Sequence, residues 1–156
     1  MDTQRLELSR DLRELLKVFL SHDVRFLVIG GHAVSFHGYP RFTKDLDIRV
    51  ELSAGNANRI VSALRSFGLD FPELTEDMFL DPDRMTQMGR EPNRVDILMK
   101  IRGVDFGDCY DRKELVNIDG SLIPMISKSD LITNKRSTGR LQDLADIENI
   151  TPPIGS

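Results

Sequence analysis

Two aspartates separated by one residue lie inside an apolar stretch of this chain, in the sequence DLDIRVEL that begins at Asp45. On a β-strand, residues two apart point to the same side, so Asp45 and Asp47 project together. Two carboxylates that close repel each other, and burying either one unpaired is costly. We therefore expect a positive partner between them. Mg²⁺, which prefers carboxylate, water and phosphate oxygens, suits that geometry.

A third aspartate has similar surroundings, because Asp96 stands among apolar residues in the sequence NRVDILM. A neighbouring strand that carried Asp96 beside the pair would complete a site for two ions, which bridge attacking and leaving oxygens. The alternative interpretation places all these carboxylates on a solvent-facing side of their strands. Arg49, Arg94 or Lys100 would then be their ion-pair partners.

A diglycine precedes the aspartate pair. Gly30 and Gly31 follow the apolar run VRFLVI, and an insert of helical length separates them from Asp45. Glycines after a strand let backbone amides approach phosphate oxygens closely. The alternative is an ordinary tight turn.

The elements that must position these residues can be traced from hydrophobic periodicity. Leu12 to Phe19 show the spacing of an amphipathic helix, and a second helix is expected from the N-cap Ser53 to Gly68. The residues 103–120 indicate a short helix and a turn. Strands are expected in VRFLVIGG, DLDIRVEL, RMTQMG, RVDILMKI and SLIPMIS, a short helix in HAVSFHG, and two helices around Ser137-Thr138-Gly139.

This mixture of strands and helices places the chain in the α/β or α+β class. We expect a mixed sheet of about four or five strands flanked by helices, with further helices at the C-terminal end. Residues 1–150 are predicted to form a single domain, and residues 151–156 a tail.

Composition narrows the function classes. The 156 residues carry a net charge of −4, which argues against nonspecific coating of nucleic acid. The single cysteine, Cys109, cannot form an internal disulfide and suits a reducing compartment. No apolar run approaches the ~20 residues of a membrane span. Charges interrupt the N-terminal apolar positions, unlike in a signal peptide. We expect a cytoplasmic protein with no membrane partner.

The order Ile29, Gly30-Gly31, Asp45-Leu46-Asp47 and then Asp96 resembles the nucleotidyltransferase superfamily. That superfamily includes DNA polymerase β, the tRNA CCA-adding enzymes, kanamycin nucleotidyltransferase and the minimal nucleotidyltransferases. A finer resemblance is to the AbiEii-type toxin nucleotidyltransferases. The segments that carry it are GGHAVSFHG, RFTKDLD, NRVDILMKIRGVDF, ISKSDLITNK and GRLQDLADIE.

The resemblance implies a fold and a reaction. Asp45, Asp47 and Asp96 would be ligands of Mg²⁺, with two ions expected and Mn²⁺ as an alternative; Asp96 could also be a general base. Gly30 and Gly31 would face the triphosphate of an NTP such as ATP. An acceptor oxygen would attack the α-phosphorus and pyrophosphate would leave, with catalysis mostly by positioning and charge neutralisation.

Five further residues are candidates for the same site. Thr43 shares the strand alternation of the aspartates and would reach the triphosphate, or it is an ordinary strand threonine. Arg41 and Arg140 would bind phosphate, or they are solvated. The resemblance implies an active-site lysine at Lys135 and an active-site acid at Asp143. The alternative is an exposed helix end.

Other polar residues are expected to be structural. His37, in the His-Gly pair, and His32, after the glycines, are more typical of packing and hydrogen bonding than of catalysis. Cys109 is expected to be half-buried.

The sequence leaves the acceptor open. The leading hypothesis is a Mg²⁺-dependent nucleotidyltransferase that modifies an RNA or protein hydroxyl, as a monomer or homodimer, in a toxin–antitoxin or phage-defence pair with an antitoxin partner. The runner-up is a catalytically inactive nucleotide-binding or interaction protein of the same fold. A metal-dependent nuclease or phosphohydrolase is a third hypothesis, disfavoured by the diglycine ahead of Asp45.

Overall fold

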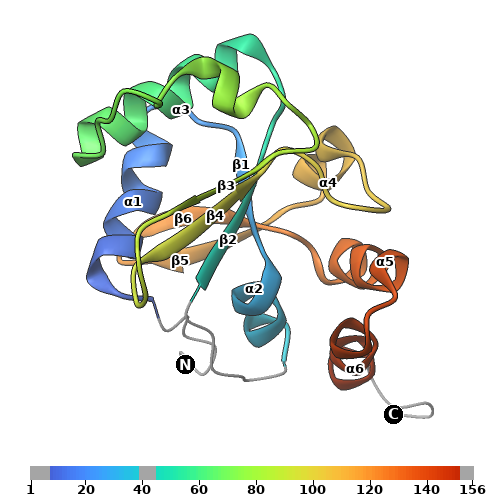
Figure 1. Cartoon of the computed structure of the whole chain (residues 1–156). Helices are drawn as coiled ribbons and strands as arrows, with labels where there is room; N and C mark the ends of the chain where they lie inside the picture. The colour runs from blue at the N-terminus through green and yellow to red at the C-terminus, as the bar shows by residue number, and fades with distance from the viewer. Residues whose placement is uncertain (1–7, 39–44, 152–156) are drawn as a thin grey trace.

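The computed structural model describes residues 8–38 and 45–151, which form alternating strands and helices (Figure 1). The strands are β1 (Phe26–Ile29), β2 (Asp45–Val50), β3 (Met85–Met88), β4 (Arg94–Leu98), β5 (Glu114–Ile118) and β6 (Ser121–Met125). The helices are α1 (Arg10–Ser21), α2 (Gly30–Phe36), α3 (Ala54–Phe67), the 3₁₀ helix η1 (Glu76–Phe79), α4 (Phe106–Asp111), α5 (Lys128–Thr138) and α6 (Leu141–Ile150).

The strands form one mixed sheet in the order β3-β4-β2-β1-β6-β5. The central strand β2 pairs antiparallel with β1 and parallel with β4. The expected α/β class with a mixed sheet is confirmed, and the sheet has six strands where four or five were expected. The additional strand is β5, in a region predicted as a helix and a turn. As an edge strand β5 buries only Val116 and Ile118, so its apolar alternation is short.

Helices cover both faces of the sheet, with α1 and α3 on one side and α2, α5 and α6 on the other (Figure 1). Helix α1 buries the stripe predicted from its spacing, Leu12, Leu15, Leu16 and Phe19. Helix α3 begins at the predicted N-cap, where the Ser53 hydroxyl accepts a hydrogen bond from the amide of Asn56. It ends at Gly68, whose φ of 107° is left-handed.

Strand β2 separates the hydrophobic core from the polar side of the sheet. Leu46, Ile48 and Val50 are each 0% exposed, whereas Asp45 and Asp47 on the opposite side are partly exposed. This period-two alternation is the one predicted from the sequence. The core therefore holds β2 firmly on one face and presents the aspartates on the other.

The C-terminal helices are the two predicted around Ser137–Gly139. The Ser127 hydroxyl caps α5 by accepting from the amide of Asp130, and Gly139 ends that helix with a φ of 68°. Helix α6 then packs beside α5. Within the described part of the chain, no helix is both long enough and apolar enough to cross a membrane.

The core face of β2 can be tested apart from its polar face. Replacing Ile48 by Ala should lower the free energy of unfolding by about 2–5 kcal/mol, because it leaves a cavity in a closely packed core. Urea denaturation measures this loss. Leu52→Ala is the control, since Leu52 is 40% exposed, and it should cost well under half as much. Equal losses in the two variants would contradict the assigned orientation of β2.

Candidate active site

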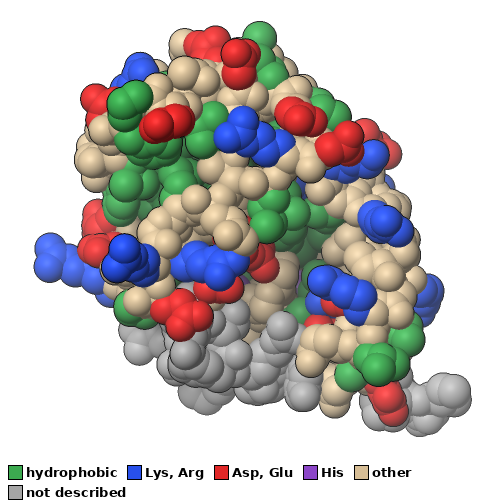
Figure 2. Space-filling view, viewed as in Figure 1, with side chains coloured by type: hydrophobic (Ala, Val, Ile, Leu, Met, Phe, Trp, Pro, Cys, Tyr) green, Lys and Arg blue, Asp and Glu red, His purple; other side chains and the backbone are tan. Residues whose placement is uncertain are grey.

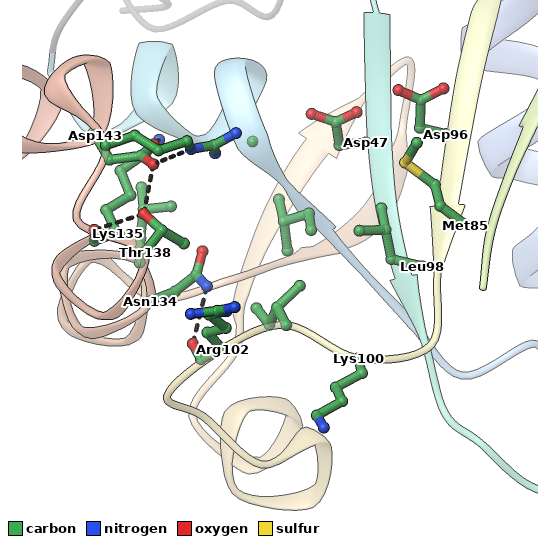
Figure 3. A pocket seen from close by; sticks show the side chains of 15 residues that line it. Asp47, Met85, Asp96, Leu98, Lys100, Arg102, Asn134, Lys135, Thr138 and Asp143 are labelled. Carbon is green, nitrogen blue, oxygen red and sulfur yellow. Dashed lines mark hydrogen bonds and ion pairs between the residues drawn. The ribbon is translucent and has the colours of Figure 1, made fainter. Parts of the chain in front are cut away.

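Two of the predicted acids lie side by side. Because β2 and β4 are parallel neighbours, Asp47 is the direct register partner of Asp96, and both side chains lie on the same side of the sheet. The two carboxylates project together at one end of the cleft shown in Figure 3. Asp96 is 7% exposed. The alternative that Asp96 is a solvated strand residue is therefore wrong, although Arg94 is its ion-pair partner.

The electrostatics of the pair are unfavourable without a cation. The pKa of Asp47 is raised to about 7, first by burial, then by the charge of Asp96 and a hydrogen bond with it, and then by the charge of Asp45. Arg94 lowers the same pKa but does not overcome these effects. Among the described residues, the negative charge of the three aspartates therefore exceeds the positive charge that Arg94 places beside them.

Asp45 joins the pair through an arginine. The Arg94 Nε lies 3.2 Å from Asp96 Oδ1 and 3.8 Å from Asp45 Oδ2. Among residues 8–38 and 45–151, no three His, Cys, Asp or Glu side chains already surround one point as a metal site would. The donor set nevertheless fits a hard divalent cation, because Asp47 and Asp96 offer adjacent carboxylate oxygens. Asp45 lies two residues before Asp47 on the same strand.

Gly30 is required by this arrangement. Its φ is 71°, and a Cβ placed on it would lie 2.1 Å from Asp47 Oδ2. The cause is the sheet register, because the preceding residue Ile29 pairs with Asp47. The diglycine therefore lets the backbone approach the carboxylate, whereas Gly31 is buried in α2.

A cleft of about 590 Å³ separates the acids from the C-terminal helices. Figure 2 shows the molecular face with this hollow, which has hydrophobic side chains in its interior and Lys or Arg side chains at its edge. Asp47 and Asp96 lie on one wall, and Lys135 and Asp143 lie on the other (Figure 3). The volume is in the range of small-molecule sites, which is roughly 300–1,000 Å³.

The far wall is built on a buried lysine. Lys135 Nζ lies 2.9 Å from Asp143 Oδ1 and 2.9 Å from Asp146 Oδ2, and all three residues are buried. Asp143 also accepts hydrogen bonds from the Thr138 hydroxyl and from Arg140 Nε. Asp143 and Asp146 are thus not on an exposed helix end, which was the alternative interpretation.

These contacts set the charge state of Asp143. Burial acts to raise its pKa, but hydrogen bonds from Arg140, Thr138 and Lys135 outweigh it and bring the pKa to about 2. The same hydrogen bond raises the pKa of Arg140, and the charge of Asp47 across the cleft contributes. The Arg140 side chain is 75% exposed. Its outer nitrogens can therefore meet an anionic ligand.

The two walls are joined by residues 99–105. Asn134 Nδ2 donates to the carbonyl of Arg102 at 2.9 Å. A Cβ on Gly103, whose φ is 85°, would lie 2.2 Å from Ser137 Oγ. Helix α5 is therefore packed directly against this segment, which fixes the width of the cleft.

The remaining residues named in the sequence analysis are either outside the described residues or structural. Arg41 and Thr43 are outside the described residues. His37 bonds the carbonyl of Ile126 through Nε2 at 2.8 Å, and burial lowers the pKa of His32 to about 4. Cys109 is fully buried rather than half-buried, and burial raises the pKa of its thiol to about 11.

The sequence analysis missed the role of Asp146, which is fully buried and forms an ion pair with Lys135. Its spacing carried a signal, because it follows Asp143 by one helical turn and shares its face. The analysis also missed these residues that line the cleft: Met85, Leu98, Lys100, Ile101, Arg102, Leu131, Asn134 and Thr138. Their types are common on any surface, so only the position of α5 across the cleft from β4 and against residues 102–103 reveals them.

Comparison with known proteins identifies the family of this chain. Residues 6–151 match the model of a family described as "Nucleotidyltransferase of unknown function (DUF6036)", and the chain belongs to that family. It is accordingly an enzyme of the transferase class. No curated protein matches the chain in sequence. The finer AbiEii-type placement stays a prediction.

Solved structures share the fold. A lincosamide antibiotic adenylyltransferase, LnuA, with lincomycin bound, is 19% identical with a TM-score of 0.58, over 92% of this chain and 96% of that one. A putative nucleotidyltransferase from Thermotoga maritima is 16% identical with a TM-score of 0.56, over 89% of each chain. An antigenic nucleotidyltransferase-like protein from Paracoccidioides brasiliensis is 16% identical with a TM-score of 0.53, over 92% and 77%.

The contact between Gly30 and Asp47 can be tested with two glycine variants. Gly30→Ala should displace the Asp47 carboxylate and weaken Mn²⁺ binding by about tenfold or more, because loss of one ligand contact costs at least ~1.4 kcal/mol. Electron paramagnetic resonance of free Mn²⁺ measures the affinity of each variant for the ion. Gly38→Ala is the control, since Gly38 also has a positive φ, 116°, but a Cβ there would contact nothing within 4 Å. Equal Mn²⁺ affinities in the two variants would contradict the assignment.

The raised pKa of Asp47 predicts a pH-dependent stability in metal-free protein. Between about pH 4 and pH 7 the unfolded chain has lost this proton while the folded protein retains it, so the free energy of unfolding falls as pH rises. Asp47→Asn should therefore be more stable than the parent at pH 8, by on the order of 2 kcal/mol, and no more stable at pH 4. Urea titrations in EDTA at both pH values measure this, with the exposed Asp83→Asn as control. A parent protein as stable as Asp47→Asn at pH 8 would refute it.

Proposed function

We propose that this protein transfers a nucleoside monophosphate from an NTP to an acceptor hydroxyl, with Mg²⁺ held by Asp47 and Asp96 and assisted by Asp45. One observation carries the proposal. The acidic pair with excess negative charge faces Lys135 and Arg140 across a cleft of nucleotide size. A divalent cation suits the first wall, and triphosphate oxygens suit both the cation and the second wall.

The chain's own residues would divide the work. Bound Mg²⁺ would supply neutralisation of the charge that develops on the phosphate oxygens. Asp47 and Asp96 would orient it. Asp96 is placed to receive the proton of the acceptor hydroxyl, since it lies beside Asp47 and lines the cleft.

The second wall would position the triphosphate. Lys135 is held in one place by two carboxylates, so its remaining N–H direction is set before substrate arrives. Arg140 is anchored through Nε to Asp143 at 2.6 Å, which leaves the outer nitrogens of its guanidinium toward solvent and ligand. Asp143 is ionised because of its low pKa. It would therefore hold the Lys135 and Arg140 side chains in place rather than carry a proton.

The sequence resemblance adds expectations about the acceptor. An RNA or protein hydroxyl, and a role in a toxin–antitoxin or phage-defence pair, stay predictions from that resemblance. Binding of an NTP such as ATP and a position of Gly31 near the triphosphate are predictions of the same kind, and the sequence leaves the preferred NTP open. A cytoplasmic location stays a prediction from composition.

Label transfer tests the proposal. Purified protein is incubated with each α-phosphate-labelled NTP, Mg²⁺ and total RNA or cell protein. Label should reach one acceptor class, and Asp47→Asn or Asp96→Asn should reduce transfer by at least about 100-fold, because the ion loses a ligand. Asp83→Asn, a change at an exposed aspartate, should leave transfer unchanged.

Two other results would favour the competing hypotheses. NTP binding without transfer to any acceptor would indicate a binding protein of the same fold. Cleavage of nucleic acid without an NTP would indicate a nuclease. Full transfer by both acid variants would refute the assigned site.

A further inference from the structure

A second cavity adjoins the cleft on the same side of the sheet. Its volume is about 320 Å³, and its lining includes Arg49, Met99, Lys100, Asp105 and Phe106. We call it the Arg49 cavity. Lys100 also lines the main cleft, and Figure 3 shows its side chain running away from Asp47 and Asp96, toward the α4 end of the molecule. The two hollows therefore share Lys100 in their linings and lie next to each other.

The distance between the two sites is short. Asp47 and Arg49 are two residues apart on β2, so their Cα atoms are roughly 7 Å apart and their side chains leave the same side of the strand. A molecule that places one group beside Asp47 can place a neighbouring group in the Arg49 cavity.

Arg49 is an uncommon residue to find there. It is 5% exposed. Its only hydrogen bond within the described residues runs from Nη1 to the carbonyl of Val104, at 3.0 Å, and its Nε has no partner. No carboxylate in the described part of the chain forms an ion pair with it. A buried guanidinium that lacks a carboxylate is costly to keep.

The carboxylates of the cavity are engaged with other groups. Glu51 lines it but receives Arg25 Nε at 2.8 Å and the Ser53 hydroxyl at 3.2 Å. Asp105 caps α4 by accepting from the amide of Asp108 at 3.3 Å. Asp105 is close enough to oppose, together with Cys109, the lowering of the Arg49 pKa by burial. Neither carboxylate forms an ion pair with Arg49 in the described part of the chain, so the Arg49 guanidinium keeps unused N–H donors for an anionic ligand beside Lys100.

We propose that the Arg49 cavity is the acceptor subsite, where Arg49 and Lys100 bind a phosphate group of the molecule whose hydroxyl lies beside Asp96. This inference rests on the proposed nucleotidyl transfer. A guanidinium and an ammonium together suit a phosphate, and the apolar side chains of Met99 and Phe106 suit the ring or sugar that carries it. The phosphate belongs either to a polynucleotide end or to a small phosphorylated acceptor.

Nuclear magnetic resonance of the ¹⁵N-labelled full chain tests this with inorganic phosphate as the probe. Phosphate should shift the amide signals of Phe106 and Gly107, which line the cavity, and of Val104, whose carbonyl accepts from Arg49. Lys100→Ala should weaken binding measured at these amides by about tenfold, because a hydrogen bond to a charged group is lost. Arg49→Gln should weaken it at least as much. Arg90→Gln, at an exposed arginine in the turn between β3 and β4, should change nothing.

The outcomes separate this inference from the function on which it rests. Line broadening by Mn²⁺ at Gly30 and Gly31 reports the acid site independently. Broadening there, with no phosphate shift at residues 104–107 in the parent protein, overturns the subsite alone. Because Lys100 is exposed, its variant tests the subsite even if Arg49→Gln does not fold; unchanged phosphate binding in Lys100→Ala also overturns it.

A second probe identifies the source of the phosphate. A short single-stranded oligouridylate that shifts residues 104–107 at lower concentration than inorganic phosphate supports a polynucleotide acceptor at the subsite. Weaker binding than inorganic phosphate, with the phosphate shifts intact, supports a small phosphorylated acceptor there.

Discussion

Repulsion between two carboxylates organises the functional side of this protein. Asp47 and Asp96 are held together by the parallel register of β2 and β4, and neither can move away because their strands are anchored in the core on the opposite face. The hydrophobic burial of Leu46, Ile48 and Ile97 thus opposes an electrostatic cost. Such a cost persists in folded proteins mainly where a ligand relieves it, which is the physical reason to place a cation there.

The opposite wall of the cleft uses the reverse arrangement. Lys135 forms ion pairs with both Asp143 and Asp146, so this buried cluster is held in place without substrate. The wall with Asp47 and Asp96 therefore carries mutually repelling carboxylates, whereas the wall with Lys135 is fixed by its ion pairs. The segment of residues 99–105 sets the distance between them, because Asn134 and Ser137 of α5 lie directly on it. Preorganisation of this kind is what positional catalysis of phosphoryl transfer requires.

In the proposed function, one strand contacts two substrates. Asp45 and Asp47 would hold the metal beside the triphosphate, and the next residue on that side, Arg49, lines the neighbouring cavity. The alternative interpretation of the sequence treated Arg49 as an ion-pair partner for the aspartates. In the structure it instead donates to Val104, because the strand carries it past the acids and under the segment that leads into α4.

Local patterns determined much of the architecture. Helix α1, helix α3 with both its caps, and strands β2 and β4 follow from spacing, N-cap chemistry and alternation, which act over only a few residues. Edge strand β5 was missed because it buries few residues and so carries a short signal. The burial of Cys109 was underestimated for a related reason, because the exposure of a residue in α4 depends on which other elements pack over that helix.

By itself, the sequence determined which side chains lie on the polar side of β2 and β4, because alternation is a property of a single strand. It also pointed to the diglycine, the acids and the C-terminal charges as parts of one site, through the order of motifs. Only the tertiary structure decided that Asp47 meets Asp96, that Gly30 must lack a side chain, and that Lys135 is buried between two carboxylates. Those facts depend on strand register and on the docking of α5 and α6, which are set by contacts between residues far apart in the chain.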